Sequence, residues 1–202
     1  ADQIALHEWA GSRASAALWR ILAGVKVGDS EHAAVSRMKY EGEPFNAHLM
    51  LASGDASSAV VGLRSPSARL LRRGDGIVGA IGFWCGLSAR GGLLSDHDDA
   101  FLKVASSYFE GLVAWYENAD IGVRGGDIYA AVTESLARGG LRSSLNPGHL
   151  TSYDEWLHSP IQPQYSGKIS SGMAFQVDII PIPLRAGYAL NCEDPLVFAD
   201  EG

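Results

Sequence analysis

The sequence has few cysteines, few methionines and a shortage of positive charge. Its two cysteines, Cys85 and Cys192, allow a single pairing and no disulfide framework, so we expect a reducing, cytoplasmic location. Sixteen lysines and arginines stand against 23 acidic residues, and the net charge of -7 argues against a nucleic-acid partner or an anionic membrane surface.

Long apolar runs are missing as well. No stretch approaches the ~20 apolar residues that a membrane helix needs. His7, Glu8 and Arg13 interrupt the first apolar stretch, which is unlike a signal peptide. The 202 residues, 47% of them hydrophobic, are enough for one core, so we expect a single domain over residues 1–202. Because the chain opens directly on a helical pattern, it could be the C-terminal domain of a longer chain.

Apolar periodicity predicts four helices. The first covers residues 2–23, and the second begins at the capping group Asp29-Ser30-Glu31 and runs to about Lys39. The third runs from Ser95 to about Asn118, and the fourth covers about residues 126–137.

The strands are predicted from shorter patterns. Residues 49–52 form a short apolar run, and the apolar, glycine-rich residues 77–94 predict a β-hairpin, because so many glycines would weaken a helix. Strand and turn signals fill residues 141–152, 172–180 and 187–198. Helices facing a mostly antiparallel sheet predict an α+β fold.

Three polar side chains of the C-terminal third are candidates for a site. Asp178 ends the alternating strand 172–178, and a carboxylate at the end of a buried strand needs a hydrogen bond, a cation or a metal. His149 and Glu193 lie on neighbouring predicted elements. Each also has a plainer interpretation, as a solvated acid or as a histidine satisfied within a turn.

The blocks that hold these residues resemble a known family. Residues 148–149, 154–160, 172–178 and 190–197 resemble, in order and spacing, the closing half of the methionine aminopeptidase, prolidase and creatinase superfamily. The resemblance covers nearly the whole chain, and it implies the pita-bread fold, with helices packed on a curved, mostly antiparallel sheet. Family members often pair, and five tryptophans are many for one small domain to bury, so we expect a homodimer.

The resemblance also implies a metal site, and this chain departs from it. Peptidases of the superfamily bind two divalent metals through five ligands, of which one His falls on His149 and two Glu fall on Asp178 and Glu193. The two Asp positions of the hairpin fall near Ala80 and Leu87, which cannot ligate a metal. Two carboxylates cannot neutralise two adjacent dications. We therefore expect no cofactor, or at most one weakly held Mn²⁺ or Zn²⁺ on His149, Asp178 and Glu193.

Three functional interpretations stay open. The chain could be a degenerate domain that binds a small molecule or a short peptide without chemistry. It could be a metal-free, creatinase-like hydrolase in which His149 is the general acid and base, oriented by Asp178 or Glu193. It could also be a single-metal peptidase of the Xaa-Pro type.

Further residues have roles only within these interpretations. In the hydrolase, Arg90 would clamp a substrate carboxylate, although it could equally anchor a strand to a carbonyl. Asp154 and its neighbour Glu155 would line the pocket or only cap a turn. The substrate-side His of the family falls in residues 60–62, which are apolar here.

Overall fold

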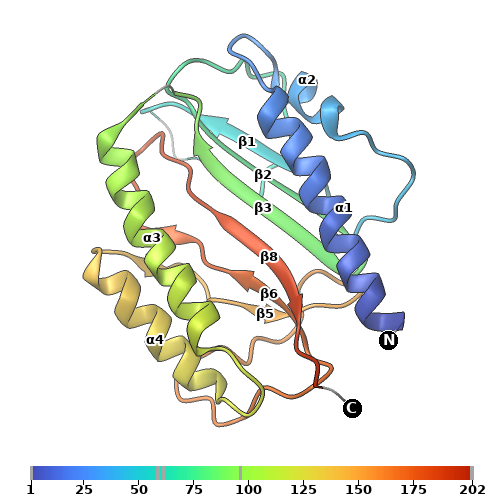
Figure 1. Ribbon diagram of the computed structural model, residues 1–202. Coiled ribbons are helices and arrows are strands. Elements are labelled where there is room, and N and C mark those ends of the chain that lie inside the picture. The colour runs from blue at the N-terminus through green and yellow to red at the C-terminus, as the bar shows by residue number, and fades with distance from the viewer. Residues whose placement is uncertain (1, 58–59, 61, 96, 201–202) are drawn as a thin grey trace.

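A six-stranded antiparallel sheet forms the centre of the molecule in the computed structural model, which describes residues 2–57, 60, 62–95 and 97–200 (Figure 1). Its strands lie in the order β1 (Met50–Gly54), β2 (Gly76–Phe83), β3 (Gly86–Leu93), β8 (Cys192–Val197), β6 (Ala174–Asp178) and β5 (His149–Leu150). Two short strands, β4 (Arg142–Ser143) and β7 (Pro181–Ile182), pair separately.

The helices divide the sheet between them. Helix α1 (Asp2–Gly24) runs along β2 and β3, while α3 (Asp99–Asn118) and α4 (Gly125–Arg138) pack together beside the other half (Figure 1). The short α2 (Glu31–Val35) and the 3-10 helix η1 (Ser36–Met38) follow α1. Each half has its own apolar core, one beneath α1 and one beneath α3 and α4.

Alternation along the strands separates a helix-covered face from an open face. On β2, Ile77 and Ile81 pack in the core beneath α1. The residues between them, Val78 and Ala80, point to the opposite face, as Leu87 of β3 does. That opposite face carries the cavity described below.

The β2–β3 hairpin is joined by a two-residue turn, Trp84-Cys85, since Phe83 pairs with Gly86. Helix α1 crosses this end of the hairpin closely. A Cβ atom on Gly86 would lie 2.7 Å from the backbone nitrogen of Gly11, so the approach requires glycine.

The predicted α+β class is confirmed, and the predicted elements lie close to the observed ones. Two helix boundaries differ from the prediction. The second helix ends at Val35 and continues as η1, instead of running to Lys39. The third begins at Asp99 rather than Ser95, because the Asp98 carboxylate accepts the backbone N–H of Phe101 at 2.8 Å and caps it. No helix within the described residues is long and apolar enough to cross a membrane.

Candidate functional site

One row of residues crosses five strands of the sheet on its open face. The register pairs Met50 with Ala80, Ala80 with Ala89, Ala89 with Glu193, and Glu193 with Asp178. Directly paired residues of neighbouring strands share a face, so the two carboxyls lie side by side at one end of the row and hydrocarbon occupies the other.

His149 reaches the same face from β5. Its pairing partner on β6 is Gln176, two residues before Asp178. The preceding residue, Gly148, has a φ of 133°, which side-chain-bearing residues rarely adopt, and the Trp115 indole N–H donates to the Pro147 carbonyl at 2.6 Å. This turn sets the direction in which the chain enters β5, and it thereby positions His149.

A side-chain hydrogen bond joins the two walls of the site. Continuing the β3–β8 register by two residues puts Pro195 opposite Leu87, and proline has no N–H to give to the Leu87 carbonyl. The buried Gln176 amide of β6 donates to that carbonyl instead, at 3.0 Å. The hairpin wall and the carboxyl wall are therefore tied together.

These residues surround a cavity of about 520 Å³. Its polar end holds His149, Glu155, Asp178, Asn191 and Glu193. The rest is mainly hydrocarbon, including Met50, Val78, Ala80, Leu87, Leu184 and Leu190. The cavity is therefore amphipathic, with one acidic end.

Burial governs the electrostatics of the carboxyl pair. Burial, together with the charge of Glu155, raises the pKa of Asp178 from 3.8 to about 7. Burial and the adjacent Asp178 charge raise the pKa of Glu193 well above its ordinary value, although the Asn191 amide donates to Glu193 at 2.7 Å. The two adjacent carboxyls therefore disfavour full ionisation of the pair, since each raised pKa reflects burial and a neighbouring negative charge.

His149 is paired with Glu155. Its Nδ1 lies 2.9 Å from the Leu150 carbonyl oxygen, and its Nε2 lies 3.3 Å from Glu155 Oε1. Burial opposes the charged imidazolium, but these two interactions outweigh it and raise the pKa of His149. The pair forms an acid–base dyad beside the carboxyl pair.

Two acceptors at the polar end of the cavity have no hydrogen-bond partner among the described residues. They are Asp178 Oδ1 and Asn191 Oδ1, and both are buried. The donors of Asn191 and His149 are committed, since Asn191 Nδ2 donates to Glu193 and both ring nitrogens of His149 face acceptors. A buried unpaired acceptor costs about 1–3 kcal/mol, so this end favours a ligand that brings donors.

Arg90 and Asp154 lie outside the cavity, in contrast to the roles suggested for them in a hydrolase. Arg90 points to the helix-covered face, where its guanidinium binds both oxygens of Asp194 at 2.8 and 3.0 Å and the Glu193 carbonyl at 2.8 Å. Arg90 therefore anchors β3 to β8, as in the second of the two roles considered for it. Asp154 is exposed in the loop after β5, and its neighbour Glu155 is the acid that faces His149.

The hairpin side of the cavity is hydrocarbon. Ala80 and Leu87, the two hairpin positions considered in the sequence analysis, both line the cavity and pack with Met50 and Ala89. Within the part of the chain that the structure describes, no group of three or more His, Cys, Asp and Glu side chains is placed to hold a metal ion. Val60 and Gly62 also line the cavity, while Val61 lies outside the described residues.

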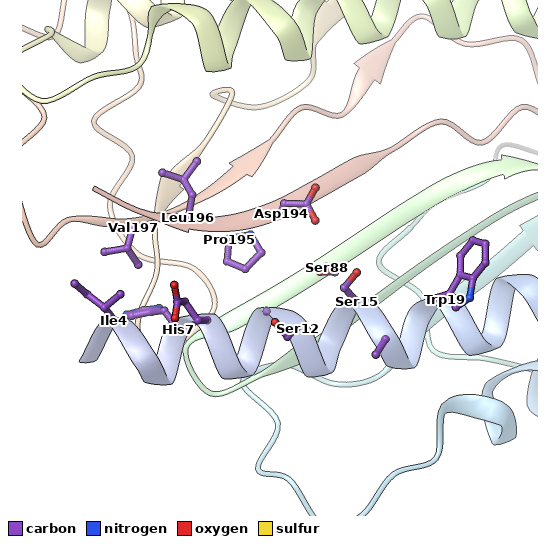
Figure 2. A pocket seen from close by; sticks show the side chains of 13 residues that line it. Ile4, His7, Ser12, Ser15, Trp19, Ser88, Asp194, Pro195, Leu196 and Val197 are labelled. Carbon is purple, nitrogen blue, oxygen red and sulfur yellow. The ribbon is translucent and has the colours of Figure 1, made fainter. Parts of the chain in front are cut away.

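A second hollow, of about 890 Å³, lies on the helix-covered side (Figure 2). Ser12, Ser15 and Trp19 of α1 face Pro195 and its neighbours on β8 across it. Of its titratable groups, Asp194 binds Arg90 and His7 Nδ1 lies 2.6 Å from the Cys85 carbonyl, while Glu8 is exposed. Among the described residues, these groups do not form a buried polar cluster like that of the first cavity.

Known structures share this architecture. The "Xaa-Pro dipeptidase" of Bacillus anthracis superposes with a TM-score of 0.84 over 100% of this chain, at 19% identity. The prolidase of Pyrococcus horikoshii gives a TM-score of 0.84 over 98% of the chain at 17% identity. The "X-Pro aminopeptidase" of Thermotoga maritima gives 0.81 over 100% at 20% identity.

The chain has the pita-bread fold. It spans 59%, 59% and 58% of the lengths of those three chains. No protein-family profile matches the sequence, and no curated protein does. The predicted pita-bread architecture is therefore confirmed, and at these identities the likeness establishes the fold alone.

Within this pita-bread structure, the sequence located part of the site. His149, Asp178 and Glu193 line one cavity, while their catalytic and metal-binding roles stay predictions. Asn191 was missed as a site residue, and Glu155 was left undecided. Asn191 stands two residues before Glu193, but the hydrogen bond that joins them has no sequence signature.

Proposed function

We propose that this chain is a binding domain whose pita-bread cavity takes a small, largely apolar molecule, or the apolar part of a short peptide, without a metal pair. The observation that carries the proposal is the row across the sheet. Ala80 and Leu87 present hydrocarbon to the Asp178–Glu193 pair, where a dinuclear centre would need two further carboxylates. Two cations against the three carboxyls of the cavity, Asp178, Glu193 and Glu155, would leave about one uncompensated charge in a buried pocket, which costs several kcal/mol.

A single cation is the most that the donor set would hold. His149, Asp178 and Glu193 are an incomplete set, and His149 already has partners on both nitrogens. We expect any Mn²⁺ or Zn²⁺ on these residues to bind weakly and to be lost on dialysis against a chelator.

Restoring the missing carboxylates tests this proposal. We expect calorimetric titration of the wild-type protein with Mn²⁺, Co²⁺ or Zn²⁺ to reveal no pair of tight sites, and an Xaa-Pro dipeptide screen to reveal no hydrolysis. We expect the Ala80→Asp/Leu87→Asp variant to gain metal-dependent thermal stability, about 2.7 kcal/mol at a metal concentration 100-fold above Kd.

The matched control is Ala80→Asn/Leu87→Asn, which introduces similar shapes without charge and should not respond to metal. Two equivalents bound tightly by the wild type, with dipeptide hydrolysis alongside, would contradict the proposal. A set of small apolar compounds, tested in the presence of a chelator, provides the positive test of binding. At least one of them should raise the melting temperature of the protein.

A metal-free hydrolase is the second candidate, and the His149–Glu155 dyad favours it. The raised pKa of His149 suits a general acid near neutral pH, and the protonated carboxyl pair lies in the same cavity. Turnover of a small amide or amidine by the chelator-treated wild type, lost in His149→Gln, would select this candidate. Binding of ligands without turnover would select the binding domain.

A further inference from the structure

We propose that the ligand of this cavity is an apolar monoamine, with its ammonium head against Asp178 and Asn191 and its hydrocarbon body along the hairpin wall. This inference rests on the proposed binding function and specifies its ligand class. It follows from three features of the cavity: the unpaired acceptors at one end, the hydrocarbon wall, and the charges at the rim.

The acceptors define the head group. Asp178 Oδ1 and Asn191 Oδ1 are buried without donors, and Asp178 is only 8% exposed. The Asn191 amide is oriented by its bond to Glu193, which leaves its oxygen free to accept. An ammonium group brings three donors and one positive charge to an end of the cavity that already holds Asp178, Glu193 and Glu155.

The hydrocarbon wall defines the body. Met50, Ala80 and Leu87 form one apolar cluster opposite the carboxyl pair, and Val78 and Leu190 extend the apolar lining. A polar body would lose its hydration against these side chains without recovering hydrogen bonds. An alkyl or aryl body instead gains roughly 25 cal/mol for each Å² of apolar area removed from water.

The rim limits the ligand to one positive charge. Arg185 lines the cavity and is exposed, with its guanidinium 5.7 Å from the centre of the Tyr188 ring. A second cationic group at the outer end of the ligand would meet this like charge. Diamines and amino acid amides with a basic side chain should therefore bind less well than a simple apolar amine.

Three probes of matched shape test the head group. Phenethylamine, phenethyl alcohol and hydrocinnamate share the same aryl and ethylene body and differ in carrying a positive, a neutral or a negative group. In calorimetric titrations with chelator present, we expect the amine to bind at least about tenfold tighter than the alcohol, the equivalent of one charge-assisted hydrogen bond. Hydrocinnamate should bind weakest.

Two variants separate the head-group interaction from general electrostatics. Asp178→Asn removes the charge and offers an N–H donor, so the amine-to-alcohol preference should fall about tenfold. Glu117→Gln makes the same change of charge on the exposed face of α3 and should leave the preference unchanged.

The possible outcomes distinguish a failure of the amine-ligand inference from a failure of the proposed binding function. An alcohol or acid that binds as tightly as the amine overturns the amine head and leaves the binding function standing. Failure of all three probes, and of the wider set of small apolar compounds, overturns the binding function itself. Retention of the full amine preference in Asp178→Asn shows that the head group lies elsewhere and contradicts this inference.

Discussion

Asp178 occupies a position where its negative charge is costly. It lies in register with Glu193, near Glu155, and its pKa rises from 3.8 to about 7 because burial and the charge of Glu155 disfavour ionisation. A folded-state pKa above the unfolded value means that the folded protein binds the extra proton. This stability contribution is complete below about pH 4 and is lost as the pH rises through about 7.

The first prediction concerns the substitution Asp178→Asn. The free energy of unfolding of this variant, measured relative to wild type, should increase between about pH 5 and about pH 8. The gain should be on the order of 1–4 kcal/mol, because the variant has one carboxyl fewer to ionise in the buried pair. Urea unfolding at a series of pH values measures it. His149, whose pKa is also raised, is common to both proteins and cancels in the difference.

The control for this prediction is Glu117→Gln on exposed α3, which should track wild type at every pH. If the difference between Asp178→Asn and wild type stays constant over the whole pH range, Asp178 ionises normally and the description of the carboxyl pair is wrong.

At this scale the sequence predicted the candidate residues that end or begin strands and left undecided those whose position depends on a loop. His149, Asp178 and Glu193 could be found because each occupies a motif and a strand, and strand register brings them together. Glu155 comes from the loop after β5, and its direction depends on a chain path that no periodicity encodes. The role of Arg90 was ambiguous because its partner, Asp194, lies on the neighbouring strand. Which residues of β8 lie beside Arg90 depends on the β3–β8 register.

At the scale of elements, one buried hydroxyl of α3 adds hydrogen bonds to the apolar packing between this helix and the sheet. The Tyr108 hydroxyl lies 3.0 Å from the Ile179 carbonyl and accepts the Cys192 backbone N–H at 2.8 Å. These two backbone groups belong to the end of β6 and the start of β8, where the Asp178–Glu193 pair sits. One side chain thus spans the point at which the strands carrying the carboxyls meet.

The second prediction is that Tyr108→Phe destabilises the fold by about 1–3 kcal/mol, because it leaves the partly buried Cys192 N–H and the Ile179 carbonyl without their partner. Chemical denaturation provides the measurement. Tyr116→Phe on the same helix, where the side chain is half-exposed, should change the free energy of unfolding by less than about 0.5 kcal/mol. Equal effects of the two substitutions would argue against a specific role for the Tyr108 hydroxyl.

Long elements were predictable from the sequence and short ones were not. Helices α1, α3 and α4 repeat their apolar spacing over several turns, and the hairpin is an apolar, glycine-rich run that covers two eight-residue strands. The strands β4, β5 and β7 have two residues each, too few for any period to be seen. Their existence depends on the partners that the fold supplies.

At the scale of the whole molecule, the surface is unusually aromatic. Trp9, Trp19, Trp84 and Trp156 are exposed, whereas Trp115 is fully buried. Trp19, at 71% exposure, borders the hollow between α1 and β8 (Figure 2). Large exposed aromatics are enriched where proteins contact one another.

The third prediction is a homodimer in solution. Light scattering at micromolar concentration should give about twice the chain mass of 21.4 kDa. If the α1 surface is the contact, Trp19→Ser should shift the equilibrium toward the monomer, while Trp84→Ser on the far turn of the hairpin should not. A 21.4 kDa species alone, at every concentration tested, would refute the dimer.

The contact between His149 and Trp156 makes the cavity optically accessible. The two ring centres are 6.2 Å apart, and Trp156 is exposed at the cavity lining. A protonated imidazolium quenches indole fluorescence at short range, whereas the neutral ring quenches it less. Emission that is lost in Trp156→Phe should therefore report the charge of His149 directly. Trp156 thus gives the cavity a built-in indicator, whose fluorescence intensity should change with pH or with a bound ligand.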